Sequence, residues 1–280
     1  MLRLMIVSLL VAVFGVAEGF AGESLPWEKK LPYKELTVVY KISGLENGKE
    51  TLYLRDYGRQ RATYRETVTK MMGTTVKDRT IEFVTPDYIY TYDLQAHEGV
   101  QGVNPQKYMV EEYEKLSPAD KDKVLSNAEK AGVAAGTMVG AKVEENALVI
   151  LGYDCDKVTV MGGSVSYIMH GTDIVLKSEV AMMGMKMVSE AVSLEEKVTD
   201  ASVFNHPPGI TAVADPDAEQ VGRSMAIQSI EVLKDPEKMT MFQEKTGEEG
   251  AVKKQMQDAQ KQIMEQAGEM LKGIQNMFGE

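Results

Sequence analysis

The stretch LTVVYKISGLENGKETLYLRDYG, Leu36 to Gly58, carries the strongest indication of how this chain folds. Its first eight residues place an apolar or aromatic side chain at every second position, which is the period of a strand with one buried face. Asn47-Gly48 follows, and this dipeptide is typical of the two-residue turn of a β-hairpin. A second strand-like run, ETLYLRDY, comes directly afterwards. The stretch therefore predicts a hairpin that turns at Asn47-Gly48 and belongs to an antiparallel sheet.

The strand-like pattern recurs along most of the chain. The runs before residue 100 are rich in Tyr and Thr, as half-buried strands are. They are ETLYLRDY, RQRATYRETVT, TTVKDRTIEFV and YIYTYD. The runs after residue 146 are ALVILGY, DKVTVMG, VSYIMH, DIVLKSEVAM and MKMVSEAVSL. The prolines and the glycine of SVFNHPPGI, residues 202–210, are expected to end the β-rich part.

Two helices are expected to interrupt this sheet, because the period of the pattern changes between residues 104 and 136. Pro105 is placed to begin a helix that runs to Tyr113. Ser117-Pro118 begins a second helix that runs to about Ala131. The chain is therefore expected to be an α+β protein whose antiparallel sheet carries a helical insert at about residues 105–133.

The start of the chain has the parts of a secretory signal. Arg3 precedes an apolar run from Leu4 to Ala17, and the small residues Gly19 and Ala21 follow it. The run is shorter than the roughly 20 apolar residues that span a bilayer, although a retained signal anchor is an alternative. We expect residues 1–21 to be a cleaved signal peptide and the mature protein to be periplasmic or secreted.

The end of the chain is expected to be a helical tail, residues 213–280, that follows the β-rich part at residues 22–212. Apolar residues step by threes and fours from Val252 to Met277, which places them on one face of a helix. The tail has no core of its own. It is therefore expected to dock on the sheet, to pair with another copy or another envelope protein, or to lie on a membrane surface.

Composition and motifs argue against several functions. The formal net charge of -11 argues against a nucleic-acid partner, since such partners require clustered Lys and Arg. The chain has no nucleophile elbow, no H-E-x-x-H, no C-x-x-C and no phosphate-binding glycine loop. We therefore expect no enzymatic activity, no catalytic residue, no cofactor and no resident metal ion.

The single cysteine and a group of basic residues are expected to be structural. Cys155 lies between Asp154 and Asp156, whose charges disfavour a thiolate, so it is expected to be a small buried strand residue. The basic residues alternate with acidic ones and are expected to form a solvated sheet face. They are Arg55, Arg59, Arg61, Arg65, Lys77 and Arg79.

Two copies of Met-Met-Gly lie between strand-like runs. They are Met71-Met72-Gly73 in TVTKMMGTTVKD and Met182-Met183-Gly184 in SEVAMMGMKMVS. Glycine suits the positive φ of a tight turn, so both are expected to be hairpin reversals. After the second copy, Met185 and Met187 are two residues apart and should share a face of their strand. Both hairpins are thus expected to present apolar tips.

Three interpretations of these methionines stay open. Burying one Met stabilises a protein by about 1.5–3 kcal/mol, so the tips are expected to be covered, and the tail is the nearest apolar cover. The second interpretation is a site for an apolar ligand, since Met adapts to varied shapes. The third is Cu(I) binding through thioether sulfur, although no His or Cys lies within the cluster.

The order of these segments resembles a family of uncharacterised bacterial envelope proteins whose domain is similar to the periplasmic lipoprotein carrier LolA. The resemblance covers residues 33–210 and rests on TVVYKISGLENGKETLYLRDYGRQRATY, IYTYD, LGYDCDKVTV and VFNHPPGI, with G-Y-x-C at Gly152 to Cys155 as its most distinctive part. It implies a strongly curved antiparallel sheet, or half-barrel, with the helical insert as a plug, and a concave face that holds acyl chains. The chain departs from the carrier in having a single tryptophan, Trp27.

We therefore expect a non-enzymatic periplasmic binding protein for an acyl chain, a lipid or a lipidated protein. The alternative is an envelope interaction or assembly module that acts through the C-terminal helix. The residues expected to form the apolar surface and its cover are Met71, Met72, Met182, Met183, Met185, Met187, Met256, Ile263, Met270, Ile274 and Met277.

Overall fold

The computed structural model describes residues 25–27, 31–71, 74–138, 142–160, 164–182 and 185–235, and its account of side chains leaves out residues 71, 129–138, 160, 182 and 185. The expected signal peptide and the tail beyond residue 235 lie outside the described residues. The described strands are β1 (Glu35–Gly44), β2 (Glu46–Arg55), β3 (Gln60–Met71), β4 (Thr74–Val84), β5 (Tyr88–Asp93), β6 (Glu98–Val103), β7 (Lys142–Ile150), β8 (Tyr153–Val160), β9 (Ser164–Met169), β10 (Val175–Met182), β11 (Met185–Glu195) and β12 (Ala212–Ala214). The described α-helices are α1 (Pro105–Glu114), α2 (Pro118–Met138) and α3 (Ala218–Lys234).

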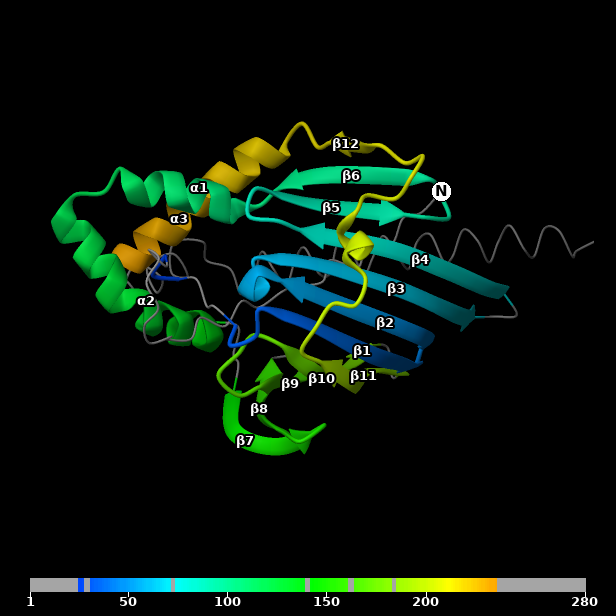
Figure 1. The fold of residues 1–280 in the computed structure, drawn as a ribbon. Helices are drawn as coiled ribbons and strands as arrows, with labels where there is room; N and C mark the ends of the chain where they lie inside the picture. Colours follow the sequence, from blue (N-terminus) through cyan, green and yellow to red (C-terminus); the bar gives the residue numbers. More distant parts are fainter. Residues whose placement is uncertain are drawn as a thin grey trace, which may run out of the picture. The chain divides into compact units, whose positions relative to one another are not determined.

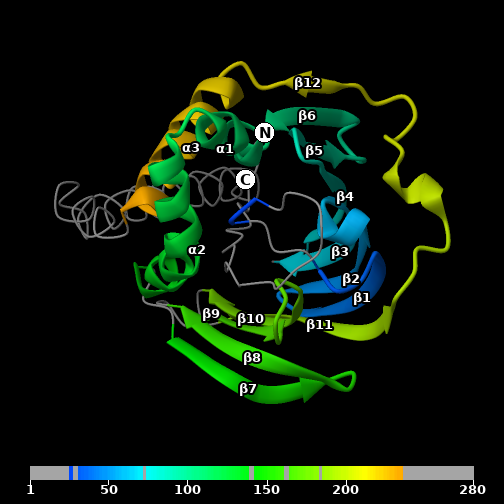
Figure 2. The same ribbon diagram turned by 60° about the vertical axis from the view of Figure 1, so that its left-hand side comes forward.

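All twelve strands form one sheet in the order β12-β6-β5-β4-β3-β2-β1-β11-β10-β9-β8-β7. Neighbouring strands are antiparallel except for the parallel pair β12 and β6. The sheet curves strongly without closing, and α1, α2 and α3 lie on its open side (Figures 1 and 2). The predicted α+β class with a large, curved, mostly antiparallel sheet is confirmed at this level.

The first hairpin turns three residues earlier than its sequence predicts. Gly44 ends β1 with φ of 106°, and Glu46 already begins β2. Asn47 and Gly48 lie inside β2, where Gly48 pairs with Thr67 of β3. A Cβ atom on Gly48 would lie 2.0 Å from the carbonyl oxygen of Glu66, so glycine is needed here for the close approach of two strands. The turn predicted at Asn47-Gly48 is therefore wrong.

Two strands were not expected from the sequence. β6 has the sequence EGVQGV, which contains too few apolar residues to show a strand pattern. β12 pairs with β6 and extends the sheet beyond the expected end at residue 210. A Cβ atom on Gly99 would lie 2.8 Å from the ring of Tyr92 and 3.1 Å from the Cα atom of Ala212. Gly99 thus allows β6 to lie close to β5 and β12, although the sequence of β6 has no strand pattern.

The helices pack on one another and on the edge of the sheet. Asn104 caps α1 by accepting a hydrogen bond from the amide of Gln106 at 3.1 Å. α3 contacts α1, α2 and β6, and Gly222 of α3 lies against the ring of Tyr108. The compact unit that contains the sheet extends to Lys234. α3, which lies within the expected tail of residues 213–280, packs with the other helices in this unit.

Three clusters of buried side chains hold this unit together. One lies on the concave side of the sheet, between β1–β2 and β7–β10. One joins the three helices to Trp27. The third lies on the outer side of β3, β4 and β5, where it is covered by residues 196–211, here called the strap. Figures 1 and 2 show the strap running from β11 to β12 along the outer side of the sheet.

Candidate binding surface on the concave side of the sheet

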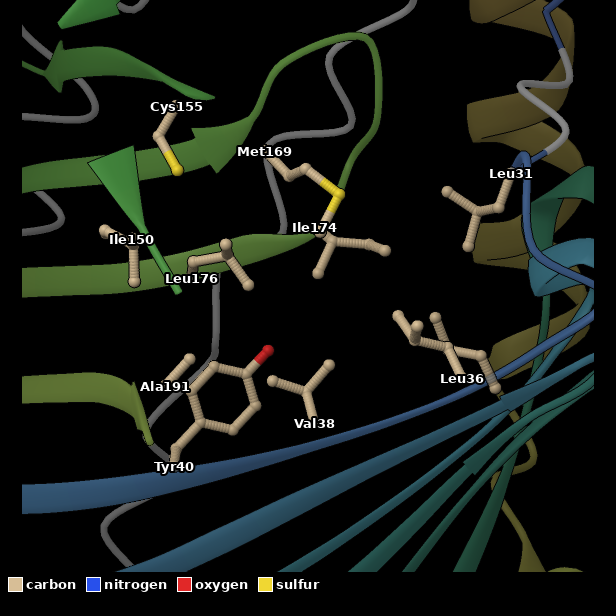
Figure 3. Packing of buried hydrophobic residues seen from close by; sticks show 11 residues of the cluster. Leu31, Leu36, Val38, Tyr40, Ile150, Cys155, Met169, Ile174, Leu176 and Ala191 are labelled. Carbon is tan, nitrogen blue, oxygen red and sulfur yellow. The ribbon is translucent and has the colours of Figure 1, made fainter. Parts of the chain in front are cut away.

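The concave side carries an apolar surface built from two distant parts of the chain. Leu36, Val38 and Tyr40 project from β1, and Figure 3 shows them facing the residues of the opposite wall. That wall includes Leu176 of β10 and Cys155 of β8, and both side chains are fully buried. The alternation that opens LTVVYKIS therefore selects the inner face of the sheet, as its pattern predicts.

The described cover of this surface is Leu31. Its side chain is 2% exposed and belongs to the same cluster as Leu36 and Leu176. Its amide donates a hydrogen bond to the carbonyl of Tyr57 at 3.1 Å, which holds the N-terminal segment against the turn between β2 and β3. A Cβ atom on Gly58 would lie 2.8 Å from Cδ1 of Leu31, so glycine leaves room for this contact.

The helical insert was expected to plug the concave side, and its described side chains do not take this place. None of the described side chains of α1, α2 or α3 belongs to the concave cluster. They pack instead around Trp27, whose ring lies edge-on to Tyr113 at 5.3 Å between centroids. α1 and α3 bury their apolar faces against each other, whereas Leu31 packs against the concave cluster.

A group of charged side chains lies next to the apolar surface on the concave side. Arg65 of β3 pairs with Glu46 at 2.7 Å and with Glu50 at 3.1 Å, and Glu50 is the cross-strand partner of Tyr40. Burial, with a smaller effect of Glu50, raises the pKa of the Tyr40 phenol. Arg65 was expected on a solvated face, and its side chain is 25% exposed. The prediction is wrong for Arg65 because its alternation places it inside the curve.

Glu82 of β4 also lies on the concave side. It pairs with Thr63, which pairs with Leu52, and Leu52 packs against the concave cluster. Burial raises the pKa of the Glu82 carboxyl, and the charge of Glu50 raises it further. In the part of the chain that the structure describes, no hydrogen bond or ion pair is found for Glu82. The group around Arg65 therefore contains three carboxylates, those of Glu46, Glu50 and Glu82.

The structure reverses the chain at both Met-Met-Gly sequences, as predicted. Met71 of β3 pairs with Thr74 of β4, and Met182 of β10 pairs with Met185 of β11. Both reversals lie at the same end of the sheet as the turn between β1 and β2. Gly44 at that turn pairs with Met187 of β11, and Glu46 pairs with Thr69 of β3. Figure 1 shows the helices at the opposite end.

Of the eleven residues expected to form the apolar surface, Met187 is the one whose side chain is described. It is half-buried, and its Sδ atom lies 4.0 Å from a guanidinium nitrogen of Arg65. The backbone is described for Met71, Met182 and Met185. The others lie outside the described residues, so their roles stay predictions; they are Met72, Met183, Met256, Ile263, Met270, Ile274 and Met277.

Cys155 is a free, fully buried residue of β8, as expected. Burial raises the pKa of its thiol, and the charges of Asp156 and Asp154 add to this effect. A reactive thiolate is therefore disfavoured at this position. Within the described ranges, no group of three or more His, Cys, Asp or Glu side chains could hold a metal ion, and no helix is long and apolar enough to cross a membrane.

Sequence reasoning missed the residues that cover the two sides of the sheet. Leu31 stands alone in KKLPY, without a periodic neighbour. His206 of the strap lies against Phe83 with 5.4 Å between ring centroids, and its ring nitrogen Nδ1 is 2.6 Å from the hydroxyl of Tyr92. The aromatic residues of SVFNHPPGI, in a segment without strand or helix pattern, were the available signal for this packing.

No protein-family model and no curated protein matches the chain. Among solved structures, it is similar to an uncharacterized conserved protein from Thermus thermophilus, with a TM-score of 0.39 and 11% sequence identity. The similarity covers 66% of this chain and 92% of that chain. A similarity of this degree indicates neither a common family nor a shared function. The resemblance to the lipoprotein carrier therefore stays a prediction.

Proposed function

We propose that this protein is a non-enzymatic binding protein of the bacterial envelope that holds an apolar ligand against the concave side of its sheet. The ligand class is an acyl chain, a lipid or a lipidated protein. The observation that supports the proposal most is the apolar surface formed by β1 and β10, covered by the side chain of Leu31. Leu31 and the partly buried Tyr33 come from the segment before β1, outside the sheet, and this cover is one that a chain-like ligand can replace.

The ligand enters from the end of the sheet that carries the two Met-Met-Gly turns. The helices occupy the other end. There, Trp27 packs with side chains of all three helices. Met187 lines the entry side, and a flexible thioether adapts to ligands of different shape. Arg65 and its two glutamates form the polar limit of the surface, so the ligand's apolar part lies between them and Leu31.

The proposal is tested with Leu31→Ala and the uncharged apolar dye Nile red. Removing the buried leucine leaves a cavity and costs about 2–5 kcal/mol of unfolding free energy. An apolar molecule that occupies this cavity recovers part of that loss, as small aromatic molecules do in engineered apolar cavities. We expect Leu31→Ala to bind Nile red at least about fivefold more tightly than the natural protein, and palmitate to displace the dye.

The matched control is Leu125→Ala on α2. Leu125 is 65% exposed, so its removal opens no cavity, and dye binding should not change. Circular dichroism establishes that both variants keep the sheet. The proposal is contradicted if Leu31→Ala and the natural protein bind Nile red with equal affinity, or if palmitate does not displace the dye.

A further inference from the structure

A small cavity lies on the outer side of the sheet, where the strap crosses the ends of β2, β3 and β4. Its volume is about 190 Å³. Its lining residues come from the end of β2, the start of β3, the end of β4 and the strap. They are Arg55, Gln60, Arg61, Phe83, Val84, Thr85, Phe204 and His206. Arg55 therefore shares one small cavity with three rings, whereas the guanidinium of Arg61 pairs with Asp173 on the concave side of the sheet. No carboxylate is among its lining residues.

The two arginines differ in their charge balance. Arg61 forms an ion pair with Asp173, and its Nε atom donates to the carbonyl of Gly58 at 3.3 Å. Arg55 donates from Nε to the side-chain oxygen of Gln60 at 2.7 Å. No carboxylate in the described part of the chain pairs with Arg55. The positive charge of Arg55 is thus available to an anion in the cavity.

The position of Arg55 is held by an aromatic contact. Its guanidinium carbon lies 4.1 Å from the ring centre of Phe204, over the face of the ring. The guanidinium plane is a geometry that matches a carboxylate with two parallel hydrogen bonds. With Nε occupied by Gln60, the terminal nitrogens remain for a ligand. Stacking on Phe204 also reduces the freedom that binding would otherwise remove.

The remaining walls are aromatic rings together with Val84 and Thr85. Phe83 is 3% exposed, and its ring meets the ring of His206 at an angle of 80°. Aromatic rings prefer such edge-to-face or offset neighbours, so these walls suit a flat aromatic ligand. An apolar cavity of about 150 Å³ accommodates benzene, so this one has room for a six-membered ring with a small substituent.

We infer that this cavity binds a small aromatic carboxylate. The carboxylate accepts hydrogen bonds from the guanidinium of Arg55, and the ring lies among Phe83, Phe204 and His206. The site is separate from the concave surface and does not depend on the function proposed for it. The strap supplies two of its walls, so ligand binding stabilises the strap on the outer side of the sheet.

The test uses benzoate and benzamide, which have the same shape and differ in charge. The chain has three histidines, so the ring signals of His206 can be followed by NMR during titration and assigned with His206→Gln. We expect benzoate to shift the His206 signals saturably and to bind at least tenfold more tightly than benzamide. Equal affinity for the two molecules, or benzoate shifts confined to His97 and His170, overturns the inference.

Three variants locate the charge. Arg55→Met should reduce benzoate affinity to that of benzamide, whereas Arg55→Lys, which keeps the charge without the planar fork, should weaken it severalfold. Arg79→Met is the matched control, because Arg79 lies in β4 and pairs with Glu66 at 3.1 Å, outside the cavity. If Arg55→Met loses its fold, Arg55→Lys and the benzoate-to-benzamide ratio of the natural protein decide the question. Unchanged benzoate affinity in Arg55→Lys and a ratio near one contradict the site.

Discussion

The hydroxyl of Tyr92 lies 2.6 Å from Nδ1 of His206, although the two residues are 114 positions apart in the chain. Tyr92 projects from β5 and is 2% exposed, whereas His206 belongs to the strap. Their hydrogen bond joins the strap to the outer cluster of the sheet. The hydroxyl of Tyr64, which donates to the carbonyl of Val203, and the stacking of Arg55 on Phe204 hold the same part of the strap.

We predict that Tyr92→Phe loosens the strap. The substitution keeps the ring and removes one hydrogen bond, which lowers the free energy of unfolding by roughly 0.5–1.5 kcal/mol. Urea unfolding followed by tyrosine fluorescence measures the change, and hydrogen exchange of residues 200–210 should rise. Tyr57→Phe is the control, since Tyr57 is 43% exposed and should give no difference. An equal effect of the two substitutions would contradict the role of the Tyr92–His206 bond.

We predict that Gly48→Ala strongly destabilises the protein. The Cβ atom of an alanine at position 48 would lie 2.0 Å from a backbone oxygen of β3, so the substitution forces two paired strands apart. The expected loss is roughly 1–3 kcal/mol or more, as for overpacked sites. Gly209→Ala is a demanding control, because Gly209 has φ of 79° and open space around it. A larger loss for Gly209→Ala would place Gly48 in a turn, where the sequence pattern puts it.

The pair of His170 and Asp156 should make a small, pH-dependent contribution to stability. Nδ1 of His170 lies 2.9 Å from Asp156, and this hydrogen bond and charge raise the pKa of His170 above 6.5. Because the pKa is raised on folding, the contribution is present below about pH 6.5 and is lost as the pH rises through the folded-state pKa. The pair is exposed, so the contribution is roughly 0.2–1 kcal/mol.

A double-mutant cycle with His170→Gln and Asp156→Asn measures this coupling. We expect a favourable coupling energy at pH 5.5 and none at pH 9, with NMR titration of the His170 ring reporting its pKa. Asp156 also accepts a hydrogen bond from the amide of Asn146, so the single Asp156 variant alone does not isolate the pair. A coupling energy that grows with rising pH would contradict the sign of this prediction.

We predict that Glu82→Gln stabilises the protein at neutral pH. Burial and Glu50 raise the pKa of Glu82, so its ionised form is disfavoured in the folded state. Stability from the protonated form is present at low pH and is lost as the pH rises through the folded-state pKa. The gain in Glu82→Gln should therefore be roughly 0.2–1 kcal/mol at pH 7 and should fall toward zero near pH 3.

The control for Glu82→Gln is Glu66→Gln, measured by urea unfolding at the same pH values. Glu66 faces the other side of the sheet and pairs with Arg79 and with Lys49. Its neutralisation should leave stability unchanged or slightly reduced at pH 7. The prediction fails if Glu82→Gln is less stable than the natural protein at pH 7.

Periodicity in the sequence predicted the local structure where one face of a segment is buried. The four alternating residues from Leu36 to Ile42 are all buried, and the strands that flank each Met-Met-Gly sequence pair with each other. The expected helix starts at Pro105 and Pro118 agree with α1 and α2. Periodicity failed for β6, because EGVQGV has glycine where a pattern needs side chains.

The sequence by itself determined which segments become strands, which face of β1 turns inward and where several hairpins reverse, because these follow from contacts within a few residues. Tertiary structure alone decided that β1 lies between β2 and β11, that Leu31 fills the concave side, and that Arg55, Phe83 and His206 meet around one cavity. Those contacts join residues far apart in the chain. The alternation of apolar residues in a segment predicts that one of its faces is buried. Which distant segment covers that face depends on which surface fits it in the tertiary structure.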